Sequence, residues 1–436
     1  MTTPQEFNPN SEEPNPPAPF PRKEGEAGED GEGKVQPVPS SFLPREGYAP
    51  EGITSYPQLV AGGGSVPPVS QSADGDTRLD SPPTPPARLG ELDVCRGLAI
   101  LAVVFIHVSG HFLPALHPAK SHAPPTWAWY ALAAPNQAFQ WAVPCFLMLS
   151  ALVNGLGLAR KPDLQRYARR RVQTALLPYL LWSGLYVLVN VLVKHQAVPG
   201  PRHLLVLLQY GTAYFHLYFF VLVLELYVLL PLLVPLFRRR PPLWAVALEA
   251  LVLQAAVYAL NRFVLPHRLQ GTILWDVLPV ALGLWLMGRA DRLPLTLARG
   301  WWAAGTVALG ALCVYEPLAL AVQLPHVAHA PVNTALFQGA EWLYTAGASV
   351  LTLALAFAAG RGALGAVLGY LGAESLAIYV MHPLAILALD KMGMNRHIGV
   401  GLGFVIYYVA CLALPLAAAW TWGRIRAAAG GARRPA

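Results

Sequence analysis

The sequence predicts an all-α polytopic membrane protein with about ten transmembrane helices, preceded by a disordered Pro-rich tail. Of its 436 residues, 55% are hydrophobic and only 13% are charged, which is too apolar for an ordinary soluble domain. Apolar stretches long enough to cross a bilayer recur along the chain after residue 93. The basic residues flank these stretches, so the net positive charge does not indicate binding to nucleic acid.

The first 90 residues form the predicted tail. They contain 18 prolines, with Gly, Ser and Glu and few clustered apolar residues. Such a segment cannot bury enough apolar surface to offset its conformational entropy. It has no charged start followed by an apolar stretch and a cleavage site, so it does not resemble a signal peptide. Residues 1–93 carry a net charge of −9, whereas 94–436 carry +16.

Ten apolar stretches are predicted to span the membrane, with boundaries known to within a few residues. The second is long, and Pro144 predicts a kink or a tilt in it. Together the stretches predict a membrane domain over 91–421 and a short basic cytoplasmic tail over 422–436. The ten are 94–114, 128–158, 173–193, 214–237, 243–264, 272–288, 300–319, 335–359, 364–388 and 398–421.

The basic loops predict the orientation of the bundle. If the N-terminal tail is cytoplasmic, the loops and tail on the cytoplasmic side carry 17 Lys and Arg residues, and the opposite loops carry 7. Positively charged loops stay on the cytoplasmic side. The asymmetry therefore favours ten spans with both termini in the cytoplasm.

The first span carries Arg96 and His107, which are eleven residues apart. At 3.6 residues per turn their side chains point within about 20° of each other, about 16 Å apart along the axis. An ionisable group at depth costs several kcal/mol unless it faces a bundle interior or a wet cavity. A neutral histidine there can accept a proton, although a structural histidine bonded to a neighbouring helix is an equal alternative. His111 lies one turn further along nearly the same face.

Further polar residues interrupt the later spans. Intramembrane acidic residues often pair with arginine or tyrosine, so a structural role is favoured for each of them. Ser375 and His382 share a helix face, and His382 can bond a carbonyl group freed by Pro383. The set comprises His216 and Glu225 in the fourth span, Asp276 in the sixth, Glu341 in the eighth, and Ser375 and His382 in the ninth.

The loop after the second span is strongly basic. Positive loops fix topology, which is one role for these arginines. Clustered guanidinium groups also bind phosphate bidentately, so a phosphate clamp at the cytoplasmic mouth is a second role. The arginines are Arg166, Arg169, Arg170 and Arg171.

The cysteines and histidines predict neither a disulfide framework nor a metal site. Cys95, Cys145, Cys313 and Cys411 lie far apart in apolar segments without CxxC spacing, as expected of small buried hydrophobic residues. The histidines lie on separate spans without carboxylate partners at ligand spacing.

Four stretches resemble the membrane acyltransferase 3 family, the bacterial O-acyltransferases of cell-surface glycans. ELDVCRGLAILAVVFIHVSGH resembles its opening helix, in which ten residues separate an arginine from a histidine. YARRRVQTALLPYLLWSGLYVL resembles its basic loop and third helix, with Thr174 where a further arginine is frequent and with the Arg166–Arg169 pair in a shifted register. YFHLYFFVLVLELYVLLPLL resembles its His-Leu-Trp-Phe segment, with Tyr218 for the tryptophan. SLAIYVMHPLAI resembles its late helix ending in Tyr-x-x-His-Pro.

The resemblance implies that the domain over 91–421 transfers an acyl group, most often acetyl, from cytoplasmic acyl-CoA to a sugar hydroxyl. The enzyme would lie in the bacterial cytoplasmic membrane, with acyl-CoA as a co-substrate and no bound cofactor; protein partners are not indicated. His107 would take the hydroxyl proton or carry the acyl group, and Arg96 would orient the donor or stabilise negative charge. The remaining candidates are Arg166, Arg169, Arg170 and Arg171 for the donor, and His216, Glu225, Ser375 and His382 on the acceptor side.

Two alternatives remain from the residues. A multispan exporter of a glycan or lipid-linked intermediate fits the composition equally well, but no convincing similarity between the two halves is visible. A different membrane acyltransferase, acting on proteins or lipids through one histidine, is disfavoured by the Arg96–His107 spacing.

Overall fold

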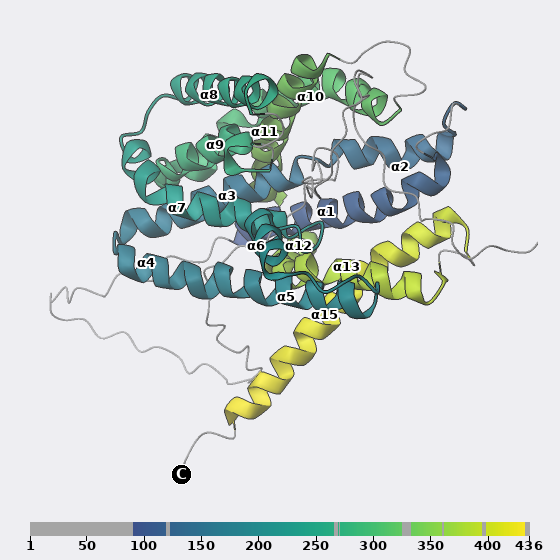
Figure 1. The fold of residues 1–436 in the computed structure, drawn as a ribbon. Coiled ribbons are helices and arrows are strands. Elements are labelled where there is room, and N and C mark those ends of the chain that lie inside the picture. Colours follow the sequence, from purple (N-terminus) through teal and green to yellow (C-terminus); the bar gives the residue numbers. More distant parts are fainter. Residues whose placement is uncertain are drawn as a thin grey trace, which may run out of the picture.

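The computed structural model describes residues 90–118, 123–265, 269, 271–324, 333–359, 362–394 and 398–431. Every regular element in these ranges is a helix, which confirms the predicted fold class (Figure 1). The predicted Pro-rich tail lies outside the described residues except for Gly90. The first helices are α1 (Gly90–Leu116), α2 (Trp127–Ala138), α3 (Ala142–Arg160), α4 (Leu164–Arg171), the π-helix η1 (Val172–Leu176), α5 (Leu177–Leu192), α6 (Pro201–Tyr210), α7 (Tyr218–Arg238) and α8 (Leu243–Phe263). The others are the 3₁₀-helix η2 (Ile273–Asp276), α9 (Val277–Met287), η3 (Ala290–Arg292), α10 (Leu293–Gln323), α11 (Thr334–Ala359), α12 (Ala363–Ala373), α13 (Ser375–Lys391) and α15 (Val400–Gly431).

All ten predicted spans fall on helices. Within the described ranges, eight helical segments are long and apolar enough to cross a membrane. The stretch predicted at 364–388 is the pair α12 and α13, which is bent by 71° and can form a ninth span. The stretch at 272–288 is the shorter apolar helix Ile273–Met287. The chain is thus a multi-pass membrane protein, and the cytoplasmic placement of both termini stays a prediction.

One detail differs from the sequence prediction. The second span is interrupted at residues 139–141, between α2 and α3, and not at Pro144, which lies inside the first turn of α3. A proline is tolerated in the first turn because its missing N–H has no partner within the helix there. Within the predicted basic tail, α15 continues to Gly431.

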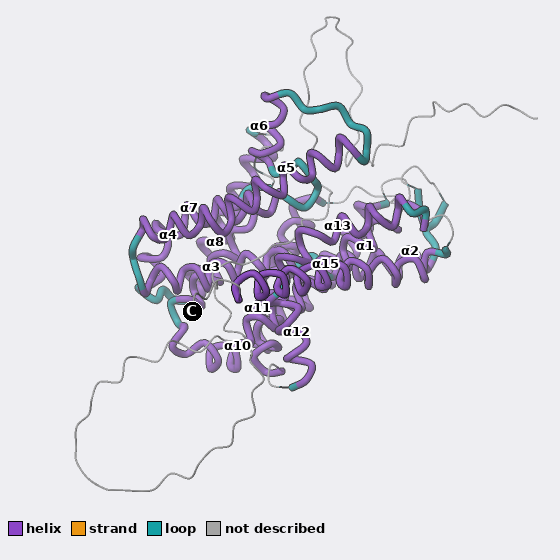
Figure 2. Tube along the Cα trace, turned by 90° about the horizontal axis from the view of Figure 1, so that it is seen from below, coloured by secondary structure: helices purple, strands orange, loops and turns teal. Residues whose placement is uncertain are grey.

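The helices differ greatly in how deeply they are enclosed. In the second span, Trp127–Arg160, 78% of the apolar window is buried, against 17% in Ala290–Gln323. The main core cluster draws on α1, α3, α7 and α13. Both views place α4 and α2 at opposite ends of the bundle (Figures 1 and 2). Functional groups on the inner helices are therefore shielded from lipid, and the bundle offers them two distinct ends.

Glycines let α12 pack directly on the first turns of α1. A Cβ atom at Gly97 would lie 2.0 Å from the Leu368 carbonyl oxygen, and one at Gly372 would lie 1.8 Å from the Asp93 carbonyl oxygen. No larger residue fits such backbone contacts without separating the helices. This contact fixes the start of α1 against α12.

The segment between α6 and α7 turns into the bundle. α6 ends at Tyr210 and is followed by Gly211, whose φ of 66° lies in the left-handed region that glycine adopts most readily. The Asn190 side-chain amide then donates to the Ala213 carbonyl oxygen at 3.0 Å. His216 and Leu217 are fully buried. The turn thus delivers a histidine into the core from a non-helical segment.

Candidate active site

Three histidines that are far apart in sequence meet inside the bundle. The ring centroids of His107 and His382 are 4.8 Å apart, and those of His216 and His382 are 5.7 Å apart. His107 comes from α1, His216 from the segment before α7, and His382 from α13. Their exposed fractions are 6%, 0% and 0%. We call this group the histidine cluster.

Aromatic rings surround the histidine cluster. The ring centroid of Phe215 lies 4.9 Å from that of His107. The ring centroids of Tyr186 and Tyr379 lie 5.0 and 5.1 Å from that of His216. The Tyr379 hydroxyl donates to the His216 carbonyl oxygen, and the Tyr186 hydroxyl donates to that of Val380 at 2.7 Å. These bonds join α13 to α5 and to the segment before α7, and so fix the backbone that carries His216 and His382.

The hydrogen bonds of His382 define its tautomer. Its Nδ1 lies 3.0 Å from the Ile378 carbonyl oxygen, which can only accept, so in neutral His382 Nδ1 carries the proton. Nε2 is then a proton acceptor. Among the described residues, neither Nε2 of His382 nor either ring nitrogen of His216 has a hydrogen-bond partner. The cluster therefore offers nitrogens that can bind or move protons.

Arg96 lies in the first half of α1, whereas His107 lies in the second. Its guanidinium Nη1 lies 2.8 Å from Asp93 Oδ1, and both side chains are about nine-tenths buried. Since Asp93 is one turn earlier on the same helix, the pair is set by local geometry. The Arg96–His107 spacing places this pair about 16 Å from the histidine cluster along the axis.

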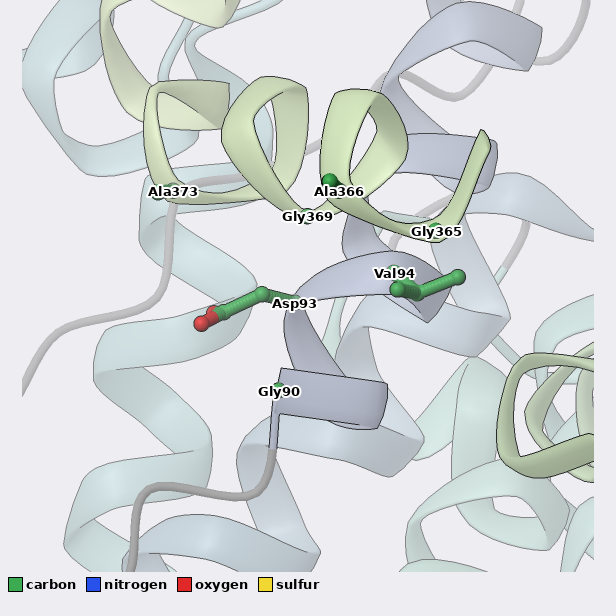
Figure 3. A pocket seen from close by; sticks show the side chains of 7 residues that line it. All are labelled: Gly90, Asp93, Val94, Gly365, Ala366, Gly369 and Ala373. Atoms are coloured by element: carbon green, nitrogen blue, oxygen red, sulfur yellow. The ribbon is translucent and has the colours of Figure 1, made fainter. Parts of the chain in front are cut away.

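A cavity of about 320 Å³ opens beside this pair, between α1 and α12 (Figure 3). Among the described residues that line it, Asp93 is the only charged one, and the others are small or apolar. This part of the wall therefore offers no cation to a phosphate group. Its lining residues are Gly90, Asp93, Val94, Gly365, Ala366, Gly369 and Ala373.

The basic loop is the short helix α4. Asp163 caps it by accepting from the Arg166 N–H at 2.9 Å. Arg166, Arg169 and Arg170 are exposed, whereas Arg171 is buried. A π-helical turn follows at Val172–Leu176, a feature frequent at functional sites. Three of the four predicted donor arginines are thus exposed on the surface.

Arg171 points inward. Its Nη1 donates to Asn154 Oδ1 at 2.8 Å. Its guanidinium lies 5.3 Å from the centroid of the Tyr167 ring and 4.9 Å from that of Tyr227. These contacts join α4 to α3 and α7, which is a structural task.

A family model described as an acyltransferase domain matches residues 89–421. The chain belongs to the acyltransferase 3 family. It is therefore a membrane O-acyltransferase, which decides against the exporter. Searches of curated proteins and of solved structures give no match.

Two candidates of this acyltransferase lie apart from the histidine cluster. The Glu225 carboxylate accepts from the Ile273 N–H at 2.7 Å, where η2 begins. It therefore stabilises a helix start, as the structural alternative predicts. Ser375 is the first residue of α13 and is buried, two turns before His382. Its hydroxyl has no hydrogen-bond partner among the described residues.

Sequence reasoning missed the residue that supports α1 beside His107. The Asn136 amide donates to the Ile106 carbonyl oxygen and to Ser109 Oγ, both at 2.8 Å. An asparagine inside an apolar stretch, followed at once by Gln137, was the available signal. The aromatic wall gave no signal, because Tyr and Phe are ordinary core residues of a bundle.

The cysteines are closer together than the sequence suggests. Cys95 and Cys145 are both buried, with their sulfur atoms 3.6 Å apart. Both are free thiols packed between α1 and α3. Among the described residues, no group of three or more His, Cys, Asp or Glu has a geometry that could hold a metal ion.

Proposed function

We propose that the protein transfers an acetyl group from cytoplasmic acetyl-CoA to a hydroxyl of a cell-surface or exported carbohydrate, in the bacterial cytoplasmic membrane. The observation that carries this proposal is the histidine cluster. In it the ring centroids of His107 and His382 are 4.8 Å apart, and His107 lies on the helix that also bears Arg96. A donor-binding end and a proton-transfer centre on one helix are what acyl transfer to a hydroxyl requires.

The reaction needs a group that moves one proton. The hydroxyl oxygen forms a bond to the thioester carbon and loses its proton, the carbon–sulfur bond breaks, and the thiolate gains a proton. His107 is buried in the cluster and can carry that proton from oxygen to sulfur. The alternative role is transient attachment of the acyl group to a ring nitrogen of His107, at the same position in the cluster.

The arginines of α4 are the best match for the phosphates of CoA. Arg166, Arg169 and Arg170 are exposed residues of α4, the helix at one end of the bundle (Figure 1). Guanidinium groups bind phosphate oxygens bidentately and keep their charge at any physiological pH. The described residues that line the cavity beside Asp93 include no such group, so this lining suits an uncharged part of the donor.

Distance restricts what Arg96 can do. A group that stabilises the developing oxyanion must lie about 3 Å from that oxygen. Arg96 is about 16 Å from His107 along α1. We therefore assign Arg96 to orienting the donor, with the acyl end of the extended donor chain reaching His107, and not to the oxyanion.

Aromatic rings near the opposite surface suit a sugar acceptor. Tyr214 stacks on Tyr186 with ring centroids 4.3 Å apart, and the Lys194 ammonium lies 4.4 Å from the centroid of the Tyr214 ring. Lys194 is exposed, so this row of side chains leads from the surface to His216. Rings of this kind pack against the C–H faces of sugars and leave the hydroxyls to polar groups.

The test is acetyl-CoA turnover by full-length protein in nanodiscs. We expect thiol release that depends on an added hydroxyl compound, with the acetyl ester detected by mass spectrometry. Long-chain acyl-CoA in a parallel reaction tests the choice of acetyl. Folded protein that neither binds nor cleaves any acyl-CoA would contradict the proposal.

A further inference from the structure

A second imidazole lies one turn beyond His107. His111 Nε2 is 3.1 Å from Asp390 Oδ1, which joins α1 to the end of α13. The Tyr407 hydroxyl of α15 donates to the same Asp390 oxygen at 2.7 Å. Tyr407 also stacks on the His111 ring, with centroids 5.3 Å apart. The imidazole is therefore fixed by a carboxylate on one side and a ring on its face.

This arrangement sets the chemistry of His111. With Nε2–H donated to Asp390, neutral His111 presents Nδ1 as a proton acceptor. Nδ1 makes no hydrogen bond to any residue that the structure describes. A histidine oriented by a carboxylate is the arrangement that activates a hydroxyl nucleophile.

Accessibility also separates the two histidines. The side chains of His111 and Asp390 are 27% and 28% exposed, whereas His107 is 6% exposed. Residues four apart on a helix are neighbours on one face, with Cβ atoms about 6 Å apart. Both residues lie on the part of α1 that is remote from Arg96 and the donor end. An acceptor arriving from the far end therefore reaches His111 before His107.

We propose that His111, oriented by Asp390, is the base that deprotonates the acceptor hydroxyl. This inference rests on the proposed acyl transfer. The hydroxyl oxygen forms its bond to the acyl carbon and gives its proton to His111 Nδ1. The carbon–sulfur bond breaks, and a proton passes from His111 through His107 to the thiolate. Both histidines end neutral, and the products are an ester and a thiol.

Two substitutions separate this chemistry from a structural role. His111→Gln can still donate a hydrogen bond to Asp390 but cannot accept and pass on a proton. His111→Ala removes both properties. We expect both variants to lose about 100-fold or more in kcat. Recovery of activity in His111→Gln would show that His111 only ties α1 to α13, and it would overturn the proposal.

Acceptor acidity gives a second readout. The probes are ethanol and the more acidic 2,2,2-trifluoroethanol, each with acetyl-CoA and full-length protein in nanodiscs. An acidic alcohol needs less help from a base, so the loss caused by His111→Gln should shrink with trifluoroethanol. Equal losses with both alcohols would contradict base catalysis by His111.

Controls keep the two proposals distinguishable. Tyr407→Phe keeps the His111–Asp390 bond, so we expect only a few-fold loss, and Asp390→Asn should cost about tenfold or more. His203→Ala, on exposed α6, should match wild type. Folded wild type that neither binds nor cleaves acetyl-CoA contradicts the proposed acyl transfer. Wild-type turnover that His111→Gln retains contradicts only this inference.

Discussion

The two halves of α1 hold their polar residues in different ways. Arg96 is paired within one turn of its own helix, with Asp93 at 2.8 Å, and this half packs on α12 through glycine. His107 instead meets His382 of α13 and Phe215 of the segment before α7. The Arg96–Asp93 pair lies within α1 alone, whereas the contacts of His107 need three separate parts of the chain. The proposed donor end is thus set mainly by local contacts, whereas the proposed reaction centre needs distant parts of the chain.

The largest effect is expected from a substitution that disrupts the packing of α12 on the first half of α1. Gly372→Ala places a Cβ atom 1.8 Å from the Asp93 carbonyl oxygen, so α12 must move away from α1. We expect a loss of about 3 kcal/mol, seen as a lower melting temperature and lower yield of folded protein. Gly369→Ala on the same helix is the control, because its Cβ would lie 3.9 Å from Val94 Cγ2, an ordinary contact. Equal melting temperatures of the two variants would contradict the close packing.

A smaller effect is expected when the ion pair is broken but α12 stays in place. Asp93→Asn removes the carboxylate that orients Arg96. Because a misplacement of about 1 Å at a binding group can cost about 100-fold, we expect kcat/KM for acetyl-CoA to fall about 10- to 100-fold. Asp93→Glu keeps the charge and should recover part of the loss. A variant with unchanged kcat/KM would remove the pair from donor binding.

The smallest effect concerns the exposed arginines. Arg169→Gln should raise KM for acetyl-CoA about three- to tenfold with little change in kcat. Added salt should narrow the difference in KM between this variant and wild type. Arg202→Gln, at an exposed arginine of α6, is the matched control. A change in kcat alone would place Arg169 elsewhere in the mechanism.

The sequence indicated the inner residues well because their types are costly in a membrane. His107, His216 and His382 were each identified from an ionisable group in an apolar stretch, and they do meet. Glu225 was identified by the same rule, yet it binds the Ile273 N–H and lies apart from the cluster. The rule identifies groups that need a partner, and it does not say which partner they have.

The sequence does not predict which neighbouring helix each side chain faces. Arg171 belongs to the same basic run as Arg169 and Arg170, but it faces Asn154 and two tyrosines inside the bundle. A run of arginines on a short helix points to several sides, and only neighbouring helices decide which side is covered. The His111–Asp390 pair joins residues 279 positions apart, so no local pattern announces it.

The most direct test of the histidine cluster is acetyl-CoA turnover by His107→Ala beside His203→Ala, in nanodiscs and with equal amounts of folded protein. His203 is exposed on α6, whereas His107 lies 4.8 Å from His382. We predict that His203→Ala releases thiol like wild type and that His107→Ala loses at least about 100-fold. Comparable turnover by the two variants would contradict a reaction centre at His107.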